Sequence, residues 1–318
     1  MRILITGADG FAGHHLIQEL ASAGFEIHGT CFQPLANPPP DVIYHTVDLR
    51  DENAVDTVVA EVGPSQIYHL AGTANVGQSY TAAWRTLENN VRAQLNVTLA
   101  CVKCGLQPRI LVVSSGDIYG DQLVDHPATE ETPLRPSNPY SVSKVTQDML
   151  ALQYYISHDL PIMRARPFNH LGPGQSRGFV APDFGFQIAE IEAGQKAPVI
   201  HVGTLSAERD FTDVRDVIRA YHLIMENGVP GEVYNIASGK TWRIGDLLKT
   251  MLSHSPIAIG VETDTARLRP GRISKVWGDS TRLRQATGWE PTIPLEQTLI
   301  EVLEDCRQRT KAFSKETK

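Results

Sequence analysis

The sequence lacks several features that would place it in a special class of protein. It contains no run of about 18 apolar residues, so we expect no membrane span. Its 29 basic and 36 acidic residues give a net charge of −7, and without a basic excess we expect no nucleic-acid partner. Hydrophobic residues make up 42% and charged residues 20% of the chain, which predicts a globular protein.

Cysteine is scarce, with four in 318 residues. Cys101 and Cys104 form a CxxC pair, but the pair lies in an apolar helical pattern, and no second Cys or His pair stands at metal-binding spacing. We therefore expect free thiols and no bound metal. Only Ile3, Leu4 and Ile5 form an apolar run near the start, whereas a secretory signal needs about 7–15 such residues. These features predict a cytoplasmic protein.

Strand and helix patterns alternate through the first half of the chain, whose length suggests about two domains. The expected strands are Arg2–Thr6, Glu26–Phe32, Val42–Val47, Gln66–Leu70, Ile110–Ser114, Pro161–Ala165 and Val233–Ile236. The expected helices are Phe11–Ala23, Asp51–Val62, Ser79–Cys104 (whole or broken), Tyr140–His158, 212–227, Arg243–Leu252 and one at the C-terminus. This alternation predicts an α/β fold with a doubly wound parallel sheet, and residues 168–210 read as irregular.

A glycine-rich turn follows the first strand, with the spacing GxxGxxG at Gly7, Gly10 and Gly13. Such a turn allows a pyrophosphate to approach backbone N–H groups at a helix N-terminus, although a turn without a ligand has the same pattern. The second strand ends at Phe32 with neither the acid typical of NAD binding nor the arginine typical of NADP binding. Asp48 ends the third strand, where it could contact the adenine or cap the next helix.

Tyr140 and Lys144 are spaced i, i+4 and therefore share one face of the predicted helix. A neighbouring ammonium favours the phenolate, so we expect the pKa of Tyr140 to be lowered toward neutrality. Ser115 directly follows the expected fifth strand, and its hydroxyl could donate to an oxyanion at the carboxyl edge of the sheet. An ordinary exposed helix pair would show the same spacing.

Together these motifs resemble the extended short-chain dehydrogenase/reductases that act on nucleotide sugars. The resemblance implies a Rossmann domain over residues 1–166, to which 212–238 returns, and a smaller C-terminal α/β substrate domain over 167–318. It implies NADP(H) or NAD(H) as cofactor, with NADP(H) slightly favoured, and a homodimer. It makes Tyr140 the acid/base and gives Ser115, Asp117 and Lys144 catalytic roles. The cofactor-binding residues it implies are Gly7, Gly10, Phe11, Ala12, Gly13, Asp48, Leu49, Leu70, Ala71, Gly72, Asn90, Tyr140 and Lys144.

Three segments are similar to a narrower group, the GDP-4-keto-6-deoxy-mannose reductases, which form GDP-rhamnose. These segments are 114–120, 166–175 and 208–216. The resemblance implies that the nucleotide sugar contacts Ser115, Asn169, Val180, Arg209 and Arg269. Arg272 stands where the family often has a ribose-binding glutamate, and a basic side chain cannot accept from ribose hydroxyls.

Other activities in the same family are also open. The resemblance implies that 4,6-dehydratases carry a glutamate at the position of Asp117. The aspartate side chain is one methylene shorter than glutamate, and because proton transfer needs close contact, the shorter side chain favours the reductase. A 4-epimerase needs only the Ser115, Tyr140 and Lys144 triad and a pocket in which the keto-sugar can turn over. A dinucleotide-sensing scaffold without activity would be expected to lose the tyrosine or the lysine, and both are present.

Overall fold

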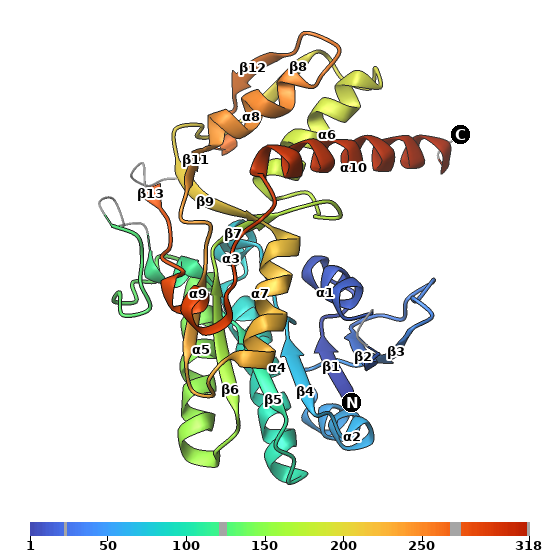
Figure 1. The fold of residues 1–318 in the computed structure, drawn as a ribbon. Helices are drawn as coiled ribbons and strands as arrows, with labels where there is room; N and C mark the ends of the chain where they lie inside the picture. Colours follow the sequence, from blue (N-terminus) through green and yellow to red (C-terminus); the bar gives the residue numbers. More distant parts are fainter. Residues whose placement is uncertain (22–23, 121–125, 268–274, 317–318) are drawn as a thin grey trace.

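The computed structural model describes residues 1–21, 24–120, 126–267 and 275–316, and its largest feature is one parallel sheet (Figure 1). The strands of this sheet are β1 (Arg2–Thr6), β2 (Glu26–Cys31), β3 (Val42–Thr46), β4 (Gln66–His69), β5 (Arg109–Val113), β6 (Ile162–Pro167) and β10 (Val233–Ile236). They lie in the order β10-β6-β5-β4-β1-β2-β3, and every neighbouring pair is parallel.

Helices cover both faces of the sheet, each over its own apolar core. One face carries α1 (Phe11–Ala21), α7 (Val214–Asn227) and α9 (Thr281–Thr287), and the other carries α2 (Glu52–Val62), α4 (Ala83–Lys103) and α5 (Pro139–His158). The strands supply buried side chains to both cores, as a doubly covered parallel sheet requires. The structure thus confirms the predicted α/β fold with a doubly wound parallel sheet.

The chain reverses its direction of winding at β1. From β1 it runs outward through β2 and β3, and it then returns to place β4 on the other side of β1. In open α/β sheets, ligands bind in the crevice at the carboxyl ends of the strands on either side of such a reversal. The turns after β1, β4 and β5 all lie at this edge.

A second group of elements packs above the sheet in Figure 1. Its elements are β7 (Asn169–Leu171), α6 (Val180–Glu192), β8 (Val199–Val202), β9 (Glu208–Asp213), β11 (Thr241–Arg243), α8 (Ile244–Ser253), β12 (Gly260–Thr263), β13 (Lys275–Val276) and α10 (Leu295–Glu316). Helices α6, α8 and α10 enclose a separate apolar core. Within this group, β9 pairs with β7, β11 and β13. It also connects the group to the sheet, because it leads directly into α7, which packs on the sheet.

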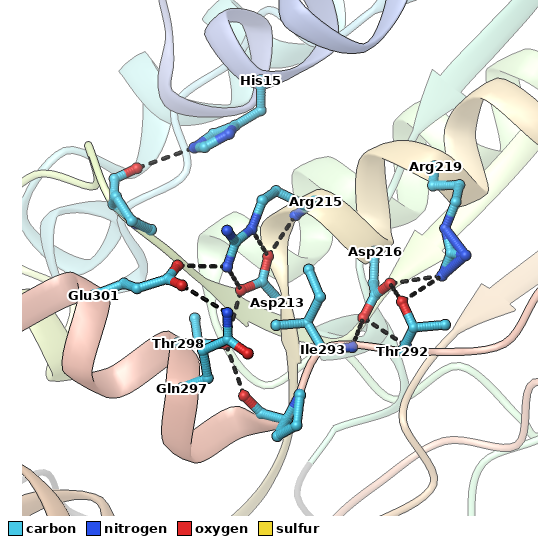
Figure 2. Close-up of polar contacts among 12 residues, drawn as sticks. His15, Asp213, Arg215, Asp216, Arg219, Thr292, Ile293, Gln297, Thr298 and Glu301 are labelled. Carbon is cyan, nitrogen blue, oxygen red and sulfur yellow. Dashed lines mark hydrogen bonds and ion pairs between the residues drawn. The ribbon is translucent and has the colours of Figure 1, made fainter.

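Two carboxylates at the start of α7 form hydrogen bonds that attach α10, and the segment before it, to α7 (Figure 2). Asp213 accepts a hydrogen bond from the Thr298 hydroxyl at 2.7 Å. Asp216 accepts from the backbone N–H groups of Thr292 and Ile293, both at 2.9 Å. Because both carboxylates are almost fully buried, these bonds are shielded from water and hold the start of α10 beside α7.

The predicted strands agree with the structure to within two residues. Of the two forms predicted for Ser79–Cys104, whole or broken, the structure has the broken one, divided into α3 (Val76–Thr81) and α4. The prediction that 168–210 is irregular was wrong, because α6 and the strands β7 and β8 lie within it and β9 begins there. Pro182 and Gly185 weaken the helical pattern of α6, yet proline is tolerated in a first turn, where no intrahelical N–H bond is lost.

Candidate active site

The glycine turn after β1 brings backbone groups close together at the reversal of the sheet. Gly7 has φ of 68°, a left-handed conformation that favours glycine. A Cβ atom at Gly13 would lie only 2.5 Å from the Gly7 carbonyl oxygen, and one at Gly7 would lie 2.9 Å from the Ala71 Cα. The backbone N–H groups in the first turn of α1 have no intrahelical acceptor, so they can receive an anion. The turn therefore fits the pyrophosphate of a dinucleotide.

The end of β2 anchors this turn. Thr30 accepts hydrogen bonds from the N–H of Gly7 at its hydroxyl (3.2 Å) and from the N–H of Ala8 at its carbonyl (3.0 Å). The ring of the next-but-one residue, Phe32, is 58% exposed, and the Arg50 guanidinium lies 6.0 Å from its centroid. A basic group thus reaches the strand end from the turn after β3, although β2 itself supplies none.

Asp48 is paired with this arginine. Its two oxygens accept from Arg50 Nε and Nη2 at 2.7–3.2 Å, and these bonds lower the pKa of Asp48. Asp48 does not cap α2, because Asp51 takes that place and accepts from Ala54 N. Leu49 follows it and accepts at its carbonyl from Asn96 Nδ2 at 2.9 Å.

Asn90 joins the turn after β4 to α5. Its Oδ1 accepts from the N–H of Thr73 at 2.7 Å, and its Nδ2 donates to the Thr73 carbonyl at 3.2 Å and to Ser143 Oγ at 2.9 Å. The side chain is fully buried, so these bonds hold the Leu70-Ala71-Gly72 turn against the helix. A Cβ at Gly72 would lie 3.8 Å from Lys144 Nζ.

Tyr140 and Lys144 lie on the buried side of α5. The helix begins with a capping box at Asn138 and has Pro139 in its first turn, which places the tyrosine one residue further on. Both side chains are nearly buried, at 9% and 6% exposure. Lys144 Nζ donates to the Val113 carbonyl at 2.9 Å and lies 5.9 Å from the centroid of the Tyr140 ring.

The prediction that the pKa of Tyr140 is lowered was wrong for this structure. Burial raises the pKa of Tyr140 to about 12, opposed by a hydrogen bond with Ser115 and reinforced by the charge of Asp117. Burial also lowers the pKa of Lys144 to about 8. Desolvation disfavours the charged form of each group, so it moves the two values in opposite directions. Burial thus favours the neutral phenol of Tyr140 over the phenolate.

A short 3-10 helix, η1 (Gly116–Tyr119), follows β5 and presents the other polar groups of the site. Ser115 caps it, accepting from the N–H of Asp117 at 3.1 Å. Asp117 Oδ2 accepts in turn from Asn138 Nδ2 at 2.8 Å. Sequence reasoning recognised Asn138 as a helix start but missed this contact, which joins two segments 21 residues apart.

Three of the predicted substrate residues, Asn169, Val180 and Arg209, lie on the second group of elements, whereas Ser115 lies after β5. Asn169 starts β7 and is exposed, Val180 starts α6, and Arg209 is half-buried within β9. The ring of His170, next to Asn169, stacks on Phe11 of the glycine turn with centroids 6.2 Å apart, so β7 reaches the dinucleotide end of the site. Arg269 and Arg272 lie outside the described residues.

Within residues 1–21, 24–120, 126–267 and 275–316, no helix is both long enough and apolar enough to cross a membrane. Within the same ranges, no three His, Cys, Asp or Glu side chains are grouped so that they could hold a metal ion. All four cysteines are free thiols.

Comparison with known proteins gives matches along nearly the whole chain. The chain is 35% identical over 312 residues to the GDP-6-deoxy-D-mannose reductase of Pseudomonas aeruginosa, covering 98% of each chain. It resembles the solved structure of RMD from Pseudomonas aeruginosa complexed with NADPH, with a TM-score of 0.84, 33% identity and coverage of 97% and 99%. It also resembles the Thermus thermophilus UDP-glucose 4-epimerase in complex with NAD, with a TM-score of 0.86, 26% identity and coverage of 96% and 99%. The family model of GDP-mannose 4,6 dehydratase matches residues 4–302, and the chain belongs to that family.

Proposed function

We propose that this protein reduces the C4 ketone of a nucleotide-linked 4-keto-6-deoxy sugar with NADPH or NADH. The substrate we propose is GDP-4-keto-6-deoxy-D-mannose, and the product is GDP-D-rhamnose. A relative at 35% identity is named a GDP-6-deoxy-D-mannose reductase, and the RMD structure at 33% identity holds NADPH. NADP(H) is therefore the favoured coenzyme in this proposal.

The buried pair of Tyr140 and Lys144 at the carboxyl edge of the sheet is the observation that carries the proposal. Ketone reduction needs an acid that gives a proton to the oxygen, and the phenol of Tyr140 is that acid. A bound reduced nicotinamide supplies the hydride. Ser115, hydrogen-bonded to the same phenol, steadies the developing alkoxide, and Lys144 stabilises the phenolate left after proton transfer.

The same proposal assigns binding roles to the remaining residues. The turn from Gly7 to Gly13 receives the pyrophosphate, and Asp48, Leu49, Leu70, Ala71, Gly72 and Asn90 surround the rest of the coenzyme. Asn169, Val180, Arg209 and Arg269 contact the nucleotide sugar. Residues 1–166 with 212–238 form the dinucleotide domain, and 167–318 mainly form the substrate domain. We propose a cytoplasmic location for the protein, because its four free thiols suit a reducing compartment.

Replacing Tyr140 by phenylalanine tests the proposal. We expect Tyr140→Phe to lower kcat by about two to four powers of ten, because the proton donor is lost, while the Kd for NADPH stays unchanged. Stopped assays of deoxyhexose formation and coenzyme titration measure the two quantities. Tyr155→Phe, on the same helix and in contact with Gly231, is the matched control. Near-normal turnover by Tyr140→Phe would refute the assignment.

We also propose that the protein forms a homodimer through α4 and α5. Val142, Met149 and Ile156 are exposed at intervals of seven residues on α5, and this spacing puts them on one helix face. Tyr80, near the end of α3, and Trp84, in the first turn of α4, are also exposed. Such a face is suited to pairing with its copy about a two-fold axis.

Size measurement tests this pairing. We expect Met149→Lys to shift the protein from dimer to monomer in light scattering at micromolar concentration, because it buries a charge at the centre of the face. Val261→Lys, which alters an equally exposed apolar residue on β12, should leave the mass unchanged. A monomeric wild-type protein would overturn the proposal.

A further inference from the structure

We infer that Asn138 is a positioning residue. Its side-chain amide fixes the Asp117 carboxylate relative to the start of α5, the helix that carries Tyr140. The structure contains this contact whatever reaction the protein performs, and its catalytic consequence rests on the proposed function.

The two ends of the Asn138 side chain serve different segments. Oδ1 accepts from the N–H of Ser141 at 2.8 Å and caps α5, while Nδ2 donates to Asp117 Oδ2 at 2.8 Å. The residue is 7% exposed, so little water competes for either bond. The cap is completed by the Ser141 side chain, which closes the capping box.

The residue type matters because several residues cap helices equally well. Serine, aspartate and asparagine all accept from the first-turn N–H groups. An ionised aspartate has no donor to offer Asp117, and a serine hydroxyl stands on a shorter side chain. Asparagine alone among them joins an acceptor for the helix to an amide donor that points the other way.

The bond matters to the site because Asp117 acts on the acid. The Asp117 charge reinforces the protonated state of Tyr140, and Ser115 accepts from the Asp117 N–H while bonding the phenol. The amide of Asn138 therefore sets the distance between η1, which carries this charge, and α5, which carries the phenol. Breaking this hydrogen bond should leave both segments folded but allow the distance between η1 and α5 to vary.

Variants that keep the cap test this role. We expect Asn138→Ser and Asn138→Asp to remain folded, with the free energy of unfolding lowered by the loss of the Asp117 bond alone, and to bind NADPH normally, yet to lose about ten- to a hundredfold in kcat with little change in KM. The loss should be larger for aspartate, which places a second negative charge beside Asp117. If both variants keep the wild-type kcat, Asn138 is only a cap and the inference is overturned.

A double-mutant cycle identifies the partner. In the Asp117→Ala background, Asn138→Ser should cost nothing further in unfolding free energy or in kcat, because the bond is already absent. Additive effects would overturn the inference. The unfolding cycle in urea needs no substrate, so it tests the contact even if the wild-type protein reduces no keto-sugar, which would refute the proposed function alone.

Discussion

At the scale of single residues, burial governs the two central side chains of the site. Tyr140 and Lys144 are both almost excluded from water. Desolvation favours the neutral form of each group, so it raises the pKa of Tyr140 and lowers the pKa of Lys144. For the tyrosine this keeps the proton that a reductase must donate. For the lysine it means that the folded protein carries a charge at neutral pH that burial disfavours.

Replacing Lys144 should therefore make the protein more stable while it loses activity. Lowering the lysine pKa from 10.5 to about 8 corresponds to a destabilisation on the order of 3 kcal/mol below pH 8. We expect Lys144→Met to raise the unfolding midpoint by several degrees at pH 7. The gain should shrink between about pH 8 and 10.5, where the folded protein already holds a neutral amine.

Calorimetry across this pH range measures the effect. Lys249→Met, at an exposed position on α8, should give no comparable gain. A Lys144→Met protein less stable than wild type at pH 7 would show that the bond to the Val113 carbonyl outweighs the cost of burial.

At the scale of elements, the glycine turn is set by contacts between backbone atoms. We expect Gly13→Ala to raise the Kd for NADPH by about tenfold or more, because its Cβ would press on the Gly7 and Ala8 carbonyl oxygens at 2.5 and 2.7 Å. Gly245→Ala is the control, since its nearest neighbour would lie at 3.4 Å. Fluorescence titration with NADPH gives both constants, and equal affinities would contradict the assigned pyrophosphate site.

Local patterns explain which elements the sequence could predict. The glycine turn and the Tyr140–Lys144 pair were identified because each lies within a few residues of chain. Helix α6 was missed because Gly185 looks unhelical, yet a Cβ there would lie 2.8 Å from Cys306 Sγ on α10. That glycine permits close helix packing, which only the tertiary structure reveals. The Asn138–Asp117 and Arg50–Phe32 contacts join segments that are distant in the sequence, so they too are revealed only by the tertiary structure.

At the scale of the whole molecule, the carboxylates of Figure 2 link the sheet domain to the C-terminal helix. Burial alone would raise the pKa of Asp213, but hydrogen bonds from Arg215 and Thr298 outweigh it and lower that pKa. A carboxyl whose folded-state pKa is depressed stabilises the fold above its unfolded pKa of about 4. This stability is lost as the pH falls further, through the folded-state value.

Removing this charge should change the acid stability of the fold. We expect Asp213→Asn to lower the free energy of unfolding by about 1 to 3 kcal/mol at pH 7, because asparagine keeps the cap but loses the charged bonds. The difference from wild type should shrink below about pH 4. Urea unfolding between pH 3 and 7 measures it, with Glu304→Gln, whose ion pair is exposed, as control. A difference independent of pH would contradict the assignment.

The central claim is that the protein consumes a reduced coenzyme to reduce a nucleotide-linked keto-sugar. The most direct measurement incubates it with GDP-4-keto-6-deoxy-D-mannose and follows reduced-nicotinamide absorbance, with NADPH and NADH in separate reactions. We predict that one coenzyme is oxidised for each deoxyhexose formed, faster with NADPH. Absence of oxidation, together with a keto-sugar formed from GDP-mannose without added coenzyme, would contradict the claim and identify a dehydratase.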